Sequence, residues 1–160
     1  MAYYFLYPEK DATLYSHPDR TTANTGHDEI LELAKEKSIT TGLYYPSRIL
    51  LKFKNEEIKD VISNTIGHST FNNPLITKSS VGLQLMSTEH KSLTTVLNIN
   101  AYAVSESWDQ GSERYLDIKH GVTSSNGTSW LYRDNTNDRT EWQKTSFAAF
   151  TTGSINSSQI

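Results

Sequence analysis

The segment Ser47–Phe53, with the sequence SRILLKF, alternates between two kinds of side chain along the chain. Ile49, Leu51 and Phe53 fall on one face of an extended strand. Arg48, Leu50 and Lys52 fall on the other face. Alternation with a period of two residues is typical of a half-buried strand. We therefore predict a strand over these residues, with the face of Ile49, Leu51 and Phe53 turned toward the core.

The spacing of apolar residues changes directly after this strand. In Asn55–Ile62 the isoleucine and valine side chains follow the spacing of one helical face. Asn55 is a residue type suited to cap a helix, and Glu56 and Glu57 stand where the helix dipole favours negative charge. The pattern predicts one short α-helix at about residues 55–63.

The composition favours a single β-rich domain. The chain has 160 residues, of which 36% are hydrophobic and 11% aromatic. A chain of this length can bury a core without disulfides or metals. The mean hydropathy of −0.56 is low, but the many tyrosines and three tryptophans argue against disorder.

Charge and cysteine content narrow the function classes. The net charge is −3 without a basic cluster, so we do not expect a nucleic-acid partner. The absence of cysteine excludes disulfides, thiol catalysis and cysteine zinc sites. No run of residues reaches the length of a membrane span, and the first residues lack the basic start of a secretory signal. We expect synthesis in the cytoplasm and no membrane insertion.

Other segments predict further short strands. Asp11–Ser16 and Phe147–Thr151 are short candidates, and Leu93–Val104 is the longest alternating segment and a candidate central strand. Glu29–Lys35 is also predicted as a strand, although its Glu, Leu, Ala and Lys residues favour a helix as the alternative. Arg20–Gly26 is rich in turn-forming residues and predicts a loop. Many short strands separated by loops favour a β-sandwich.

The same reading divides the chain into three parts. Residues 1–8 are predicted to form an N-terminal arm or a first strand. Residues 9–151 would form the β-sandwich. Residues 152–160 are rich in Gly, Ser, Asn and Gln, which is typical of a flexible tail or linker.

Several segments occur in an order that resembles a known domain family. They are Asp11–Ser16, Asn24–Gly26, Glu29–Ala34, Ser47–Phe53, Leu83–Leu85, Tyr102–Val104, Ser107–Trp108 and Thr128–Trp130. Their order over residues 11–150 resembles the DNRLRE, or disaggregatase-related, jelly-roll domains. The nearest versions are virion structural proteins of tailed phages, especially phages of marine cyanobacteria. The resemblance implies an all-β fold, namely a jelly-roll-like β-sandwich that carries one short α-helix.

The chain departs from this family after its last matching segment. The bacterial members continue with a strand ending in Trp, a Gly-Asn-Gly-like turn and a last strand near a Ser-x-Glu…Arg-Pro motif. The closing strands would then come from elsewhere, the sheet would be completed differently, or the chain would belong to a longer protein. Because an incomplete sandwich leaves an unpaired edge, this departure favours a multi-chain assembly.

The resemblance implies a non-enzymatic virion structural protein of the tail, baseplate, fibre or head surface. Such a protein would be made in the host cytoplasm, reside in the virion and dock to other virion proteins. An exposed aromatic segment and an open sheet edge are elements through which extended docking contacts form. The residues predicted to dock a partner are Tyr3, Tyr4, Phe5 and Tyr7.

The alternative function is a carbohydrate-binding adhesin module, since related bacterial modules recognise acidic polysaccharides. Aromatic rings stack on the apolar faces of sugars, and arginine holds a carboxylate with a bidentate fork. The same tryptophans would otherwise lie in the core, and the same arginines would pair with Asp or Glu. The predicted glycan-binding residues are Trp130, Tyr132, Arg133 and Trp142, with Arg48, Tyr44 and Tyr45 as additional candidates.

No motif for catalysis is present in the sequence. The five histidines are scattered, and nucleophile-elbow, P-loop and dinucleotide-binding patterns are absent. The carboxylate pairs Glu56–Glu57 and Asp109…Glu113 are the nearest approach to an acid–base pair. Adjacent glutamates at a helix start are more typical of partners for the helix dipole. We expect no enzymatic activity.

Asp134, Thr136 and Asp138 have the spacing of the first ligands in a calcium loop. Arg139 and Thr145 stand where such a loop has its glycine and its bidentate glutamate. A turn stabilised by Asp side chains explains the pattern without a metal. We expect no cofactor, and keep a structural calcium ion at Asp134 and Asp138 as the alternative.

Overall fold

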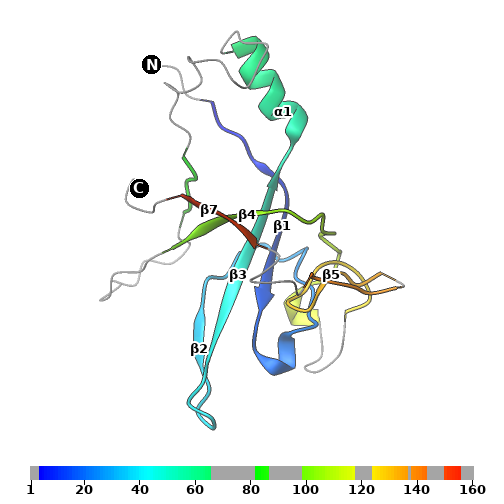
Figure 1. The fold of residues 1–160 in the computed structure, drawn as a ribbon. Helices are drawn as coiled ribbons and strands as arrows, with labels where there is room; N and C mark the ends of the chain where they lie inside the picture. The colour runs from blue at the N-terminus through cyan, green and yellow to red at the C-terminus, as the bar shows by residue number, and fades with distance from the viewer. Residues whose placement is uncertain are drawn as a thin grey trace.

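The computed structural model of the chain describes residues 4–65, 82–86, 99–117, 124–136, 138–143 and 150–155. Within these ranges the strands pair in antiparallel sheets, accompanied by one short α-helix (Figure 1). This confirms the prediction of a β-rich fold with one short helix. The elements are β1 (Pro8–Tyr15), β2 (Lys35–Lys37), β3 (Tyr44–Phe53), α1 (Asn55–Asp60), β4 (Ala101–Val104), β5 (Tyr132–Asp134), β6 (Thr140–Glu141) and β7 (Phe150–Ile155).

β3 is the central strand of a sheet with the order β1-β3-β2. β1 runs antiparallel to it, and the pairing extends from Pro8 opposite Phe53 to Tyr15 opposite Ser47. The strand predicted at Ser47–Phe53 is therefore confirmed, and it begins three residues earlier, at Tyr44. Tyr44 and Tyr45, two of the additional glycan-binding candidates, therefore lie in this strand.

The core lies on the face of this sheet that carries Leu50. Ala12 pairs directly with Leu50, and both are buried together with Leu14. Trp108 and Trp142 complete the hydrophobic cluster, and Val104 at the end of β4 packs against it. The prediction that the face of Ile49, Leu51 and Phe53 is the inner one was wrong, because β1 places two apolar side chains on the opposite face.

The second face of the same sheet is also covered, by the segment that precedes β2. Tyr15 and Ser47 are buried there. The Oγ of Ser47 donates to the carbonyl of Glu32 over 2.6 Å and accepts from the N–H of Ala34 over 2.7 Å. Because side chains take up these backbone groups, residues 29–34 form no regular strand or helix. The prediction of a strand at Glu29–Lys35 was wrong, and β2 begins only at Lys35.

The helix begins one residue earlier than a cap at Asn55 would place it. Lys54 is the N-cap residue, and its carbonyl accepts from the N–H of Ile58 over 3.2 Å. Asn55 is therefore the first helical residue. Glu56 and Glu57 occupy the first turn, as predicted. One π-helical turn, Val61–Thr65, follows α1 and brings the helical segment close to its predicted length.

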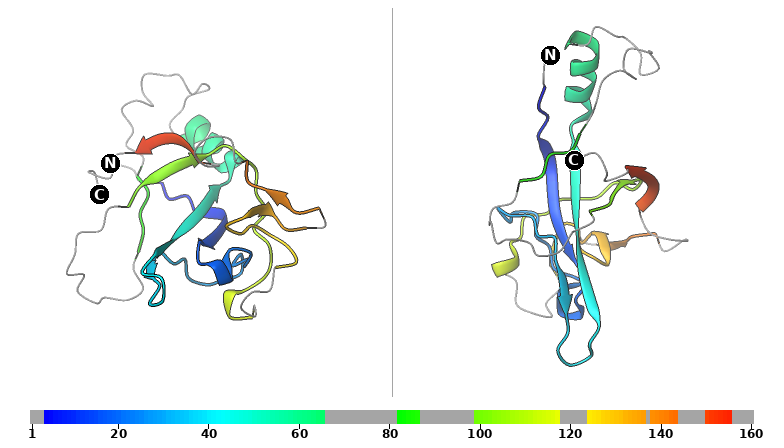
Figure 2. Two further views of the ribbon diagram at one scale, coloured as in Figure 1. Left: turned by 60° about the horizontal axis from the view of Figure 1, so that its bottom comes forward. Right: turned by 90° about the vertical axis from the view of Figure 1, so that its left-hand side faces the viewer.

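The remaining strands form two small antiparallel pairs, β4 with β7 and β5 with β6 (Figures 1 and 2). Of the candidate strand Leu93–Val104, only Ala101–Val104 is a strand, and residues 91–98 lie outside the described residues. Residues 82–86, which contain the alternating Leu83 and Leu85, form no strand. β7 continues to Ile155, into the segment predicted as a tail.

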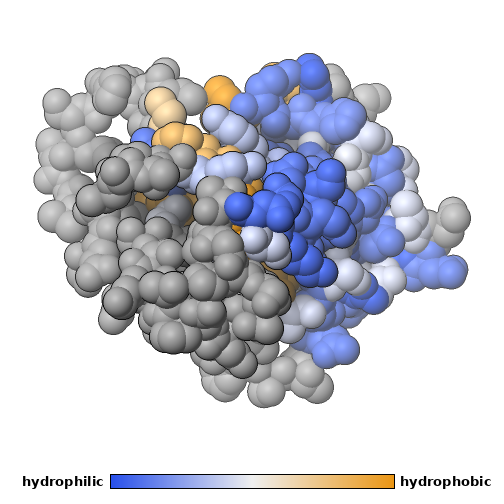
Figure 3. Space-filling view, turned by 90° about the horizontal axis from the view of Figure 1, so that it is seen from above, coloured by the Kyte–Doolittle hydropathy of each residue, from blue (hydrophilic) through white to orange (hydrophobic). Residues whose placement is uncertain are grey.

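The long β1–β3 pair gives the described part an elongated shape, with α1 at one end and the β2–β3 hairpin at the other (Figure 2). Seen from the α1 end, a broad hydrophilic area adjoins a smaller apolar one (Figure 3). Among the helices that the structure describes, none has the length and apolar character needed to cross a bilayer.

Candidate functional site

The side chain of Asn24 joins three loops that are distant in sequence. The loop Arg20–Gly26 was predicted from its turn-forming residues, yet Asn24 is completely buried within it. Its amide nitrogen donates to two backbone carbonyls and its oxygen accepts from two backbone N–H groups. The partners are the carbonyls of Gln110 (2.7 Å) and Thr128 (2.9 Å) and the N–H groups of Gly26 (3.3 Å) and Glu113 (3.1 Å).

Two glycines make room for this asparagine. Gly111 and Gly127 have φ angles of 77° and 72°, in the left-handed region that favours glycine. A Cβ atom on either residue would lie 2.7 Å from the Cγ of Asn24. The amide therefore occupies space that any other residue at these two positions would fill. Asn24 thus sets the spatial relation of the loops that carry Trp108 and Trp130.

The outer edges of the first sheet are covered at Thr13 on β1 and carry charged residues along β2. On β1 the buried hydroxyl of Thr25 accepts from the N–H of Thr13 and donates to its carbonyl, each over 2.8 Å. The outer strand β2 has three residues, Lys35–Lys37, and all are charged and exposed. Short, charged strands and covered backbone groups are how native proteins discourage edge pairing. Thr13 and β2 therefore offer little to a further strand.

The tryptophans lie in or against the core. Trp142 is buried, and its indole N–H donates to the carbonyl of Ser129 over 2.9 Å. Trp108 is buried in the same cluster, and Trp130 is partly buried against it. The structure does not form the predicted exposed platform of Trp130, Tyr132 and Trp142, because the ring of Trp142 closes the core.

The arginines proposed to hold a carboxylated sugar make internal contacts. Arg133 donates to the carbonyl of Ser107 over 3.0 Å, and its Nε lies 3.6 Å from a carboxylate oxygen of Glu106. The guanidinium of Arg48 lies 4.6 Å from the ring centroid of Trp130. Burial lowers the pKa of Arg48. The structural alternative considered for Arg133, a pair with an acidic side chain, is thus what the structure contains.

Asp134 forms a turn with its own neighbours. Its carboxylate accepts from both the N–H (2.8 Å) and the hydroxyl of Thr136. These hydrogen bonds lower the pKa of Asp134. Asp138 follows in the turn before β6. In the part of the chain that the structure covers, no group of three or more His, Asp or Glu residues is arranged to hold a metal ion.

Asp109 and Glu113, one of the two carboxylate pairs considered for acid–base catalysis, each contact another side chain. Asp109 lies 3.7 Å from the amine of Lys10. Glu113 accepts from the N–H and hydroxyl of Ser125, over 2.8 and 2.6 Å. Burial raises the pKa of Glu113, but these bonds together with one from Ser124 outweigh it and lower the pKa overall. These carboxylates act as structural partners of neighbouring loops.

The aromatic segment before β1 is exposed. The exposed fractions of Tyr4, Phe5 and Tyr7 are 57%, 68% and 77%. Tyr3 lies outside the described residues. Pro8, the last residue of the predicted N-terminal arm or first strand, is the first residue of β1. The segment therefore continues directly into a core strand, so one end of it is anchored to the sheet.

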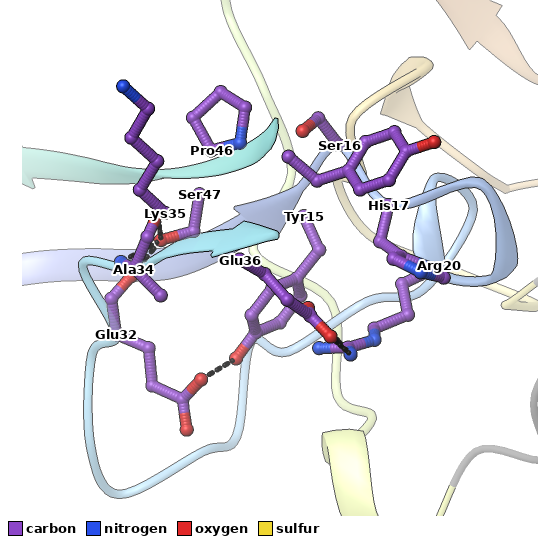
Figure 4. Close-up of a pocket in the computed structure, with 11 residues that line it drawn as sticks. Tyr15, Ser16, His17, Arg20, Glu32, Ala34, Lys35, Glu36, Pro46 and Ser47 are labelled. Carbon is purple, nitrogen blue, oxygen red and sulfur yellow. Dashed lines mark hydrogen bonds and ion pairs between the residues drawn. The ribbon is translucent and has the colours of Figure 1, made fainter. Parts of the chain in front are cut away.

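A pocket that sequence reasoning missed lies between β3 and the loop after β1. Its volume is about 400 Å³ (Figure 4). The hydroxyl of Tyr15 donates to Glu32 over 2.7 Å, and the guanidinium of Arg20 donates to both oxygens of Glu36 over 2.8 and 3.0 Å. Residues from three separate segments form it, so no local pattern marked it. Its principal lining residues are Tyr15, His17, Arg20, Glu32, Glu36 and Tyr45.

Two aromatic rings hold Arg20 in the wall of this pocket. The central carbon of its guanidinium lies 5.4 Å from the ring centroid of Tyr15 and 5.3 Å from that of Tyr115. A guanidinium beside aromatic faces is attracted by their quadrupoles. Burial, followed by the contact with Glu32, raises the pKa of Tyr15, so this hydroxyl stays protonated and remains a donor.

Comparisons with protein-family models, curated proteins and solved structures gave no match to the chain.

Proposed function

We propose that this protein is a non-enzymatic structural component of a tailed-phage virion, built on a jelly-roll-like β-sandwich. It would dock to other virion proteins through the aromatic segment before β1. The exposed aromatic side chains of Tyr4, Phe5 and Tyr7 are the observation that carries this proposal. Interfaces are enriched in aromatic residues, and exposed large aromatic side chains grouped on a surface mark interaction sites.

Of the two docking elements expected from the sequence, the aromatic segment and an open sheet edge, the proposal relies on the segment. Thr25 occupies the outer side of β1 at Thr13, and charged residues protect β2. The aromatic segment has no such protection. It also continues into β1, which is anchored along its length to β3. A partner that covers these rings would therefore be attached to the core sheet of the domain.

The test is incorporation into purified virions. A phage whose gene carries Tyr4→Ser, Phe5→Ser and Tyr7→Ser should yield particles with at least about tenfold less of this protein by quantitative mass spectrometry, since losing several aromatic contacts costs more than 1.4 kcal/mol of binding. Ile39→Ser is the matched control, because Ile39 is fully exposed at the tip of the β2–β3 hairpin. It should leave incorporation unchanged.

The variant must first be shown to fold. Because the three aromatic side chains are exposed, their replacement should leave the thermal unfolding midpoint of the purified protein within a few degrees of wild type. Normal incorporation of a folded triple variant would show that the segment does not dock. Absence of the wild-type protein from virions would overturn the proposed function itself.

A further inference from the structure

We propose that the pocket between β3 and the loop after β1 binds a neutral saccharide. The rings of His17 and Tyr45 line it and contact each other edge to face, with centroids 4.9 Å apart. The guanidinium of Arg20 and the carboxylates of Glu32 and Glu36 line it as well. A pyranose has apolar C–H faces and a rim of hydroxyls, so it complements a site that combines aromatic rings with charged hydrogen-bonding groups.

The charge balance of the pocket favours a neutral ligand over an anion. The guanidinium of Arg20 and two carboxylates, those of Glu32 and Glu36, line the pocket. The amine of Lys35 lies 4.8 Å from the ring centroid of Tyr44, which is outside the lining. The guanidinium of Arg20 already donates to both oxygens of Glu36 (Figure 4). A carboxylate or sulfate ligand would have to displace Glu36 and would meet repulsion from Glu32. Sugar hydroxyls both donate and accept, so they bind to such an ion pair without displacing it.

Hydrogen-bonding capacity remains for these hydroxyls. Tyr15 donates to Oε2 of Glu32, and no described residue donates to the Oε1 atom. The side chain of Glu36 is 44% exposed, so its carboxylate is also open to a ligand hydroxyl.

The site is preorganised. The rings of Tyr15 and Tyr115 hold Arg20, Tyr15 holds Glu32, and Arg20 holds Glu36. Side chains fixed before binding lose little entropy when a ligand arrives. The volume of about 400 Å³ falls within the ordinary range for small-molecule sites. The pocket uses none of the residues of the aromatic segment, so this proposal is independent of the virion function.

The test is a titration of the ¹⁵N-labelled full chain, followed by NMR. The probes are methyl α-glucopyranoside, methyl β-galactopyranoside, N-acetylglucosamine and the charged glucuronic acid. At least one neutral probe should give saturable amide shifts concentrated at residues 15–20, 32–36 and 45–47, and bind at least about tenfold more tightly than glucuronic acid. No saturable shift with any neutral probe up to about 50 mM, or tighter binding of glucuronic acid, would overturn the proposal.

Variants at Tyr45 separate stacking from general loss of structure. Tyr45→Ala removes the flat face and should weaken binding at least about tenfold, whereas Tyr45→Phe keeps the ring and should bind as the wild type does. Glu36→Gln removes the charge of the carboxylate that pairs with Arg20 and should weaken binding several-fold, and its thermal unfolding midpoint is measured alongside to show that it folds. Equal affinity of Tyr45→Ala and Glu36→Gln with the wild type would contradict the assignment of the site.

Discussion

The side chain of Asn24 occupies the space in which Gly111 would carry a Cβ atom. The two residues are far apart in sequence. The amide of Asn24 fits only because residue 111 has no side chain. Gly111 adopts a left-handed φ of 77°, which turns its loop around the amide. The amide in turn takes up the carbonyl of Gln110, the residue before the glycine. The packing of the loops around Trp108 depends on this relationship.

Substitution of Gly111 should therefore be far more costly than substitution of a glycine with similar backbone angles in open space. Gly111→Ala combines a strained φ with a clash against Asn24 and should destabilise the protein by about 3 kcal/mol or more. Gly42→Ala is the matched control, because Gly42 has a φ of 70° but no atom within 4 Å of its would-be Cβ. It should cost about 1 kcal/mol. Urea unfolding measures both, and equal costs would contradict the packing role of Asn24.

Asn24→Ala should destabilise the protein by about 4 kcal/mol, because it leaves two buried N–H groups and two carbonyls without their partner. Asn126→Ala is the comparison. Asn126 also bonds a backbone N–H, that of Ser112, but it does so at the surface. Its loss should cost about 1 kcal/mol or less. Chemical denaturation of both variants gives the two values, and the expectation fails if Asn24→Ala is no worse than Asn126→Ala.

Trp142 should behave as a core residue rather than as a ligand-stacking residue. Trp142→Ala should cost about 4 kcal/mol of unfolding free energy, and Trp142→Phe about 2 kcal/mol because the carbonyl of Ser129 loses its donor. Tyr102→Ala, at a half-exposed position on β4, should change stability by less than about 0.5 kcal/mol. A Trp142→Ala variant that unfolds like the wild type would place this ring outside the core.

Glu113 should make stability depend on pH in the acidic range. Its pKa in the folded protein is lowered from the ordinary value of 4.5, so its stabilising contribution is fully present above that value. The contribution is lost as the pH falls through the lowered pKa. Glu113→Gln should therefore be less stable than wild type at pH 7, and the difference should shrink below about pH 4.5. Thermal unfolding across pH 3–7 tests this, and a difference independent of pH would argue against it.

Asp28 should make the stability depend on pH in the opposite direction to Glu113. Burial raises its pKa above the ordinary value of 3.8, although the N–H of Tyr115 donates to it over 2.9 Å. Its charged form is therefore less favourable in the folded state, and the penalty grows as the pH rises through the raised pKa. Asp28→Asn keeps an acceptor for Tyr115 and should equal or exceed the wild type in stability at pH 7. The wild type should gain relative to the variant as the pH falls, which the same thermal series measures.

Local patterns were sufficient where neighbouring residues make the structure. The alternation in Ser47–Phe53 predicted β3, and the acidic first turn predicted the helix after it. Asp134 makes the turn expected of an Asp side chain two residues before its backbone partner. The contacts of the helix start and of the Asp134 turn lie within a few residues. The alternation of β3 is likewise local, although the strand that pairs with it is distant.

Local patterns failed where the partners are distant. The segment at Glu29–Lys35 has residues suited to a strand or a helix, yet Ser47 and Thr13 take up its backbone groups and leave it irregular. The inner face of β3 was misjudged because β1 contributes Ala12 and Leu14 beside Leu50. The pocket around Arg20 was missed for the same reason, since rings and carboxylates from separate segments form it.

The sequence by itself determined the β-rich class, the central strand, the short helix and the turn-forming residues, because strand alternation, helix-end charge and turn chemistry act over a few residues. Tertiary structure alone decided that Asn24 is a buried link between loops. It also decided that Trp142 closes the core and that Arg20 and Tyr45 face one pocket. Those outcomes depend on groups that are distant in sequence. The carbonyl of Gln110, for example, accepts from Asn24 across 86 positions of the chain. No local pattern encodes which distant group will satisfy a buried amide.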